Sequence, residues 1–288
     1  MKNSLFFPLG IPFDLYYKND SPKFPVGPHS HNGAEIYLTL TELPDVLLGD
    51  QVFAVPADTL ILIPPFCIHQ LYHETGKFYE RYVMNIQDNW IKNVFFEQSG
   101  ILPCLLTGSA PLLVSLSLPE MQGTKKELMD QLHKLLAFSD RSDPLALSCF
   151  FMLLSSLLKI TKTVNDQKPV IAPSSTQKRV NEIISYIQDH IREDLHIQEL
   201  ADYFHLNPDY MARLFKQHAH VTIGHYLALQ KFDFAQKLLR DGMSVQAVSE
   251  ELGFSSYAHF FKTFQKFAGI SPSKYRSRYA NTKNIPQG

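Results

Sequence analysis

A helix–turn–helix pattern that occurs twice in the second half of the 288-residue chain constrains its fold more than any other feature. The first copy begins with a helix over 197–204, followed by the turn His205-Leu206-Asn207. Asn207 is a favourable N-cap, and Pro208 suits the first position of a second helix. That second helix carries an inward apolar stripe at helical spacing, formed by Met211, Leu214 and Phe215.

The second copy starts at Val245, where the segment 245–254 resembles 197–206. Within one residue of register, Ala247 and Val248 are the counterparts of Leu200 and Ala201. A further helix follows over 255–267, with Phe260, Phe264 and Phe267 facing inward. The second helices begin near Pro208 and Ser256, 48 residues apart, and a long helix over 222–240 joins the copies. One helical hairpin is common in proteins, whereas this repeat predicts an all-α domain with two helix–turn–helix motifs.

Charge separates the two halves of the chain. Residues 1–177 hold 13 basic and 17 acidic side chains, whereas residues 178–288 hold 14 basic and 11 acidic ones. No acidic residue follows Glu251, while six basic residues do. A basic end on a balanced protein favours a polyanionic partner, although charge alone is equally compatible with a solvated face.

The second half carries a set of motifs at fixed spacing: Leu200-Ala201, Asn207-Pro208-x-Tyr210-Met211-x-Arg213-Leu214-Phe215-Lys216, Tyr226-Leu227, Ala235-x-x-Leu238-Leu239, Gly253-Phe254-Ser255 and Phe260-x-Lys262-x-Phe264-x-Lys266-x-x-Gly269-Ile-Ser271-Pro272-x-x-Tyr275-Arg276. Through these motifs it resembles the AraC/XylS family of bacterial transcription regulators over about 179–279. Three positions depart from the family pattern: His205 replaces a usual glycine, Lys231 a common arginine, and Phe261 a small or polar residue. The resemblance implies promoter DNA as partner and, in sugar-responsive members, an N-terminal cupin-like barrel followed by dimerising helices.

Two recognition helices on one chain can read successive major-groove segments. Arg213 is the best candidate for a bidentate guanine contact, with an internal ion pair as the alternative. Phe261 suits a thymine methyl group or interhelical packing. Three basic residues, Lys266, Lys274 and Arg276, suit phosphate contacts. The predicted DNA-facing residues are Asp209, Ala212, Arg213 and Lys216 on the first helix and Tyr257, Ala258, Phe261 and Lys262 on the second.

The first half is predicted to contain strands and then helices, which makes the whole chain α+β. Short runs rich in β-branched and aromatic residues favour a sandwich or a small, cupin-like β-barrel. We expect strands over 35–41, 46–55, 59–63, 68–72 and 78–86. Helices are expected over 125–138 and from Pro144, with Asp143 as N-cap, to Lys159.

The two helices of the first half are too apolar to be left in water. Leu128, Leu132, Leu135 and Leu136 fall on one face of the first helix. Packing against the barrel and burial in a dimer interface would both cover this face. We expect a homodimer through both helices, 125–138 and 144–159, because a two-fold dimer would present paired DNA-binding modules.

Three histidines and a carboxylate lie in the strand region: His29, His31, Glu35 and His69. Their spacing resembles the cupin motif, although Ala57 stands where a cupin usually has glycine. Histidines at i and i+2 of a strand share a face, so the four side chains should meet. We expect them to bind an organic effector, a sugar by family resemblance, with no cofactor and no tightly bound metal. The alternative is a metal-dependent cupin enzyme fused to a DNA-binding module.

The predicted organisation is an effector-binding and dimerisation domain over 1–162, a linker over 163–177 and a DNA-binding domain over 178–288. The predicted function is ligand-responsive, sequence-specific transcription regulation, directed at carbohydrate-utilisation genes and not enzymatic. A first domain that only dimerises is the other alternative. RNA polymerase is a candidate partner. Three separated cysteines and the lack of a long apolar segment favour a reducing, cytoplasmic location and no membrane association.

Overall fold

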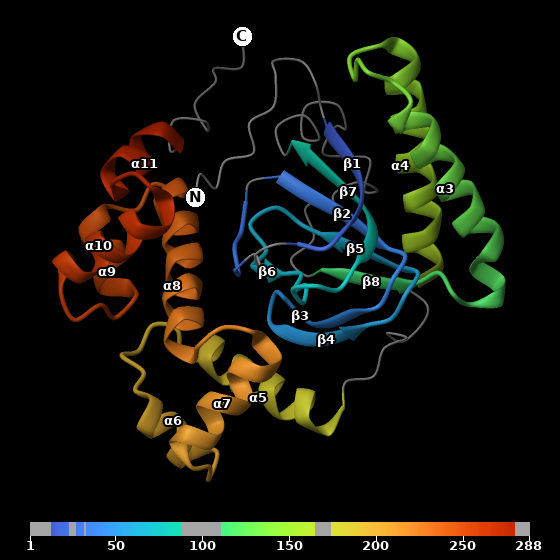
Figure 1. Cartoon of the computed structure of the whole chain (residues 1–288). Coiled ribbons are helices and arrows are strands. Elements are labelled where there is room, and N and C mark those ends of the chain that lie inside the picture. Colours follow the sequence, from blue (N-terminus) through green and yellow to red (C-terminus); the bar gives the residue numbers. More distant parts are fainter. Residues whose placement is uncertain (1–12, 23–26, 32, 88–110, 165–173, 280–288) are drawn as a thin grey trace. The chain divides into compact units, whose positions relative to one another are not determined.

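The computed structural model describes residues 13–22, 27–31, 33–87, 111–164 and 174–279 (Figure 1). They form two compact units, which divide between Ser174 and Ser175. The first contains strands and helices and the second only helices, so the α+β fold class is confirmed. Helices extend into both ends of the predicted linker, because one ends at Val164 and the next begins at Ser175. The residues between them, 165–173, lie outside the described part.

Strands of the first unit form two antiparallel sheets. The larger sheet has the order β1-β7-β2-β5-β8, and the smaller has the order β4-β3-β6. Figure 1 shows the strands of the larger sheet beside helices α3 (Gln122–Leu136) and α4 (Pro144–Val164). The strands are β1 (Phe13–Asp20), β2 (Gly33–Thr39), β3 (Leu43–Leu48), β4 (Gln51–Val55), β5 (Thr59–Ile63), β6 (His69–Gln70), β7 (Tyr79–Gln87) and β8 (Leu112–Ser115).

Strand β2 lies in the middle of the larger sheet, and its side chains alternate between two buried faces. Ala34, Ile36 and Leu38 pack in a core shared with the helices. Tyr37 packs in a second core with residues of the smaller sheet. Because Glu35 shares the face of Tyr37, its carboxylate is directed between the two sheets.

Several strands differ from the expectation. The predicted strand 46–55 is a hairpin of β3 and β4, which turns at Gly49 with φ +62°. The predicted strand 68–72 is only β6, two residues long. The pairing partners at the two edges of the larger sheet, β1 and β8, were not predicted. Strand β1 is mostly exposed, so it lacks the apolar alternation that marks a half-buried strand.

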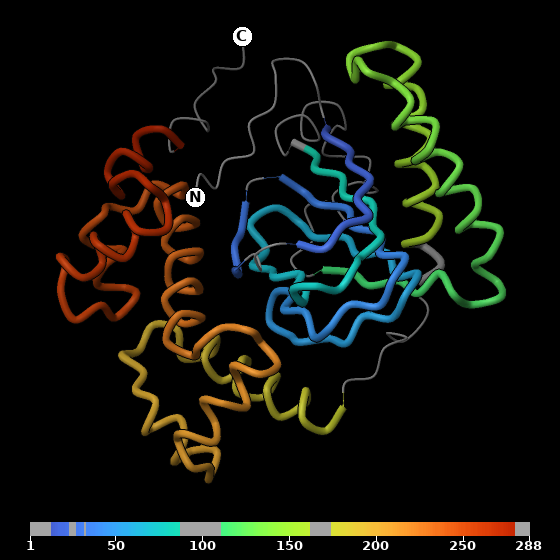
Figure 2. Tube along the Cα trace, in the orientation of Figure 1, coloured from blue at the N-terminus to red at the C-terminus, as the bar shows by residue number. Residues whose placement is uncertain are grey.

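A short 3-10 turn, η1 (Pro119–Met121), leads into α3 (Gln122–Leu136), and α4 (Pro144–Val164) packs beside it. Figure 2 traces this pair of helices after the strands. Asp143 caps α4 as predicted, since its Oδ1 accepts from the Leu145 amide at 2.8 Å. Of the predicted leucine face, Leu128, Leu132 and Leu135 are at most 3% exposed and lie in the subunit core. The expectation that this face forms a dimer interface is therefore wrong.

Helix α4 ends at Val164, beyond the predicted end at Lys159. It is the one described helix that length and composition would allow to cross a membrane. One face, however, packs in the subunit core through Ala146, Phe150, Leu153, Leu157 and Ile160. That burial is typical of the core helix of a globular domain.

The second unit contains the two predicted helix–turn–helix motifs, α6–α7 and α9–α10, joined by α8. The inward stripe Met211, Leu214 and Phe215 is buried, as are Phe260 and Phe264, while Phe267 is partly buried. The repeat register is Leu200 with Val248 and Ala201 with Ser249, one residue beyond the predicted match. The helices are α5 (Ser175–Asp189), α6 (Ile197–Tyr203), α7 (Pro208–Ala219), α8 (Ile223–Arg240), α9 (Val245–Glu251), α10 (Tyr257–Ala268) and α11 (Pro272–Tyr279).

Candidate functional site

The second helix of each motif, α7 and α10, begins at a side-chain cap. Asn207 Oδ1 accepts from the backbone amides of Asp209 and Tyr210 at 3.0 and 3.2 Å. Ser256 Oγ accepts from the His259 amide at 3.2 Å. These caps satisfy amides that have no partner inside the helix, so they fix where each helix starts.

The structure places most predicted DNA-facing residues on open helix faces. Arg213 makes no ion pair within the described part of the chain, so its guanidinium is free to bind a partner. Ala212 and Phe261 are half-buried, and the Phe261 ring lies 6.3 Å from that of Tyr257. The exposed members are Asp209, Arg213 and Lys216 on α7 and Tyr257, Ala258 and Lys262 on α10.

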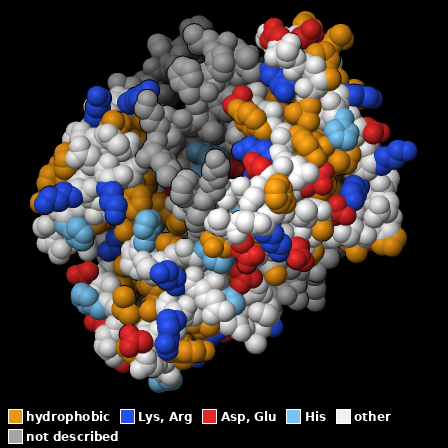
Figure 3. All heavy atoms as spheres, in the orientation of Figure 1, with side chains coloured by type: hydrophobic (Ala, Val, Ile, Leu, Met, Phe, Trp, Pro, Cys, Tyr) orange, Lys and Arg blue, Asp and Glu red, His pale blue; other side chains and the backbone are white. Residues whose placement is uncertain are grey.

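The three predicted phosphate contacts differ from one another. Lys266 and Lys274 are exposed. Arg276 is half-buried, and its Nη2 donates to the Gly242 carbonyl at 3.0 Å, so part of its guanidinium is already engaged. On the face seen in Figure 3, Lys and Arg side chains of the helical unit are spread among apolar ones.

Tyr210 is an exposed residue of α7 that the sequence analysis did not select. Its side chain is 49% exposed, and it lies three residues before Arg213, one helical turn away on the same face. Its helical spacing from Arg213 is the sequence signal that identifies Tyr210 as a further residue of this face.

A brace of Lys231 and Gly253 holds the two motifs together. Lys231 on α8 is only 6% exposed, and its Nζ donates to the Glu193 carbonyl at 2.9 Å, in the segment before α6. The same ammonium lies 5.2 Å from the centre of the Phe254 ring in the turn of the second motif. Burial lowers the pKa of Lys231, an effect that Asp194 partly offsets. One side chain of the joining helix thus contacts both the segment that leads into the first motif and the turn of the second motif.

The turn of the second motif touches the same segment through Gly253. A Cβ at this position would lie 2.2 Å from the Arg192 carbonyl oxygen, closer than atoms can approach. Gly253 also has φ +58°, and the equivalent His205 in the first turn has φ +53°. His205 is exposed, so the first turn tolerates a side chain that the second has no room for.

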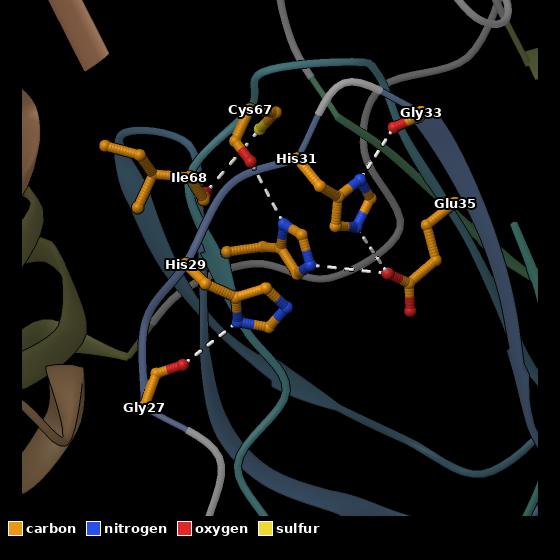
Figure 4. A network of polar contacts seen from close by, with 8 residues as sticks. Gly27, His29, His31, Gly33, Glu35, Cys67 and Ile68 are labelled. Atoms are coloured by element: carbon orange, nitrogen blue, oxygen red, sulfur yellow. Dashed lines mark hydrogen bonds and ion pairs between the residues drawn. The ribbon is translucent and has the colours of Figure 1, made fainter. Parts of the chain in front are cut away.

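The predicted histidine cluster forms in the first unit (Figure 4). His31 Nε2 lies 3.1 Å from Glu35 Oε2, and His69 Nε2 lies 3.3 Å from the same oxygen. Figure 4 shows the rings of His29 and His31 and the Glu35 carboxylate turned toward one space. One ring nitrogen from each histidine lies within 4.8 Å of the others.

The chain brings these residues together without the strand that the sequence analysis placed under His29 and His31. An isolated β-bridge pairs His29 with His69, through hydrogen bonds of 3.0 and 2.9 Å between their backbones. Glu35 comes from β2 and His69 from β6. His31, His69 and Glu35 are buried, and His29 is half-buried.

Burial and neighbours determine the charge of this cluster. Burial, aided by the nearby His69, lowers the pKa of His29 to about 4, so its ring is neutral at pH 7. Burial raises the pKa of Glu35, but the close ring nitrogens of His31 and His69 outweigh it and hold that pKa below its usual range. The site therefore presents imidazole nitrogen atoms around an ionised carboxylate.

Comparison with known proteins gives two family matches. An AraC-like ligand binding domain matches residues 14–155, and a helix-turn-helix domain matches residues 200–278. The chain belongs to the AraC family. As an AraC-family protein it is a ligand-responsive, DNA-binding transcription regulator. The histidine cluster lies inside the ligand-binding match and both motifs of the second unit inside, or overlapping, the helix-turn-helix match.

Relatives of this AraC-family chain are transcription regulators. The uncharacterised HTH-type transcriptional regulator YfiF of Bacillus subtilis is 25% identical over 88% of this chain and 80% of YfiF. The raffinose operon transcriptional regulatory protein RafR of Pediococcus pentosaceus is 32% identical over 34% of this chain and 36% of RafR. The DNA-binding domain of AdpA, solved with a target DNA, is 26% identical over 38% of this chain and 97% of that domain, with a TM-score of 0.35. Other relatives are matched over less than two thirds of their length.

Proposed function

We propose that this AraC-family regulator reads promoter DNA with the open faces of α7 and α10 and responds to a small molecule at the histidine cluster. The observation that carries the proposal is the pair of capped, outward-facing helices on one braced unit. Arg213 is the central base-reading residue of this proposal, since it is exposed and unpaired among the described residues. Lys266 and Lys274 are proposed phosphate contacts, with Arg276 contributing the part of its guanidinium that Gly242 does not bind.

The proposed effector is a sugar, and the proposed targets are carbohydrate-utilisation genes. The name of RafR, a raffinose operon regulator, supports this class of target. His29, His31, Glu35 and His69 supply donors and acceptors of the kind that bind hydroxyl groups. The protein acts as a regulator in the cytoplasm rather than as an enzyme, with RNA polymerase as a further proposed partner.

Two substitutions test the division of roles on DNA. Arg213→Ala should relax discrimination at one operator position and cost about 1–3 kcal/mol on the cognate base, because a bidentate base contact is lost. Lys266→Ala should weaken binding to every sequence alike and reduce the salt slope by about one unit, because one fewer counterion is released. Gel-shift titrations over operator variants and salt concentrations measure both effects. Identical behaviour of the two variants would refute the assignment.

A homodimer is proposed through the outer face of α4. The leucines of α3 are buried in the subunit, but Leu145, Phe151 and Met152 are 66%, 40% and 59% exposed on α4. Met152→Glu should place a charge on this face and shift the protein from dimer to monomer without unfolding it. Sedimentation velocity measures the change, and Lys126→Glu, an exposed position on α3 rather than on this face of α4, is the control. A parent protein that sediments as a monomer would rule out this interface.

A further inference from the structure

We propose that His29, His31, His69 and Glu35 form a site for one divalent transition-metal ion. The sequence pattern alone predicts only an organic effector at these residues. The directions of the ring nitrogens, which the sequence does not reveal, support the metal site. The site coincides with the proposed effector site, but the metal would bind whether or not the effector is a sugar.

The backbone fixes which nitrogen of each ring carries a hydrogen. Nδ1 of His29 lies 3.0 Å from the Gly27 carbonyl, that of His31 lies 2.8 Å from the Gly33 carbonyl, and that of His69 lies 3.0 Å from the Cys67 carbonyl. A carbonyl oxygen only accepts, so each Nδ1 must be the donor. In a neutral ring, Nε2 then carries a lone pair.

These lone pairs create a conflict at Glu35. The Nε2 atoms of His31 and His69 lie 3.1 and 3.3 Å from one carboxylate oxygen, which is itself an acceptor. In addition, the Nε2 atom of His69 is buried and has no well-directed hydrogen bond. Acceptors facing acceptors at this distance repel unless a positive charge lies among them. Either protons on buried rings or one cation in the shared space resolves the conflict.

A metal ion accounts for more of the geometry than protons do. Metal-binding histidines usually donate their second ring nitrogen to a carbonyl or carboxylate, and all three rings do so here. Protonating two rings would put two positive charges in a buried cluster around one carboxylate. A divalent ion would supply its charge at one point and use every converging atom.

The donor set limits the choice of ion. Three imidazole nitrogens and one carboxylate oxygen suit Zn²⁺, Mn²⁺, Fe²⁺, Co²⁺ or Ni²⁺ rather than Ca²⁺ or Mg²⁺, which prefer oxygen. Nitrogen ligands lie about 2.0–2.1 Å from a bound zinc ion. The three ring nitrogens must therefore lie closer to one another around an ion than the limit of 4.8 Å within which they lie in this structure. Small ring rotations about the existing Nδ1 hydrogen bonds would close the site.

The test measures metal binding directly on the full-length protein without a polyhistidine tag. After treatment with a chelator and dialysis, the protein is titrated with Co²⁺ and followed by visible absorption, and then with Zn²⁺ by calorimetry. We expect about one ion per chain and a metal-dependent rise in the thermal unfolding midpoint. Operator binding is measured separately, so the absence of metal binding would leave the proposed DNA-binding function intact.

Three variants locate the ion. His31→Ala and the nearly isosteric Glu35→Gln should weaken binding at least about tenfold. His73→Gln is the matched control, since His73 is buried in the same unit but hydrogen-bonds Tyr37 Oη at 2.9 Å outside the cluster. Circular dichroism verifies that each variant is folded, and if His31→Ala is not, Glu35→Gln and the wild-type stoichiometry decide. Wild-type protein that binds no ion, or Glu35→Gln protein that binds as tightly as wild type, would overturn the proposal.

Discussion

Gly253→Ala should destabilise the DNA-binding unit by about 3 kcal/mol or more. The left-handed backbone at this position costs an L-residue about 1–2 kcal/mol. The new Cβ would also meet the Arg192 carbonyl at 2.2 Å, so one of the two backbone segments must move, and such overpacking typically adds about 1–3 kcal/mol. Urea unfolding followed by circular dichroism measures the loss.

His205→Gly is the matched control for this prediction. His205 has the same left-handed backbone at the equivalent turn, but it is exposed. Glycine relieves the strain there, and the gain is offset in part by the larger entropy of the unfolded chain. We expect a change between neutral and about 1 kcal/mol stabilising. If both variants had the same small effect, the close approach of Gly253 to Arg192 would have no energetic importance.

Leu132→Glu should unfold the first unit rather than separate two subunits. Leu132 is 3% exposed in the core that α3 and α4 form with the larger sheet. The substitution removes a buried aliphatic side chain, which typically costs about 2–5 kcal/mol as Leu→Ala, and adds a carboxyl group that has no designed partner there. We expect a loss above about 4 kcal/mol, among the largest that single substitutions cause. Thermal unfolding and the soluble yield measure it.

Met152→Glu is the control for Leu132→Glu. The same charge is introduced on a neighbouring helix, but at a side chain that is 59% exposed. The folded state should survive there and only the oligomeric state should respond. A Leu132→Glu protein as stable as its parent would mean that the helix pair does not pack on the sheet as described.

The sequence predicted the structure best where a capping residue and the helical spacing of apolar residues indicated the same helix. Asn207-Pro208 placed the start of α7 correctly because a capping side chain acts on its own helix. The buried positions of the same helix, Met211, Leu214 and Phe215, followed from helical spacing. By contrast, the leucines of α3 looked the same whether a sheet or a second subunit covered them. Their partner is distant in sequence, so periodicity could not choose between the two.

The candidate site was predictable in its members but not in its internal geometry. Alternation along β2 put Glu35 on an inner face, and His69 followed one hairpin later. The backbone carbonyls that orient each Nδ1 belong to Gly27, Gly33 and Cys67, which carry no recognisable motif. The brace was hidden for a similar reason. A lysine in a helix and a glycine in a turn are ordinary residues until the fold brings each of them against the segment before α6.

The Lys231–Gly253 brace also bears on how binding energy is used. Two recognition helices on a flexible tether would each have to be oriented on DNA, and the second would lose much of its freedom only after the first had bound. Here part of that orientational entropy is already lost when the unit folds, because Lys231 and Gly253 hold the joining helix and the second turn against the segment that leads into α6. The two recognition helices, α7 and α10, are therefore presented to DNA with a restricted relative orientation. An operator contacts both helices only when its two contacted segments lie on the correct sides of the DNA helix. The number of base pairs between these segments therefore contributes to specificity, just as the bases do.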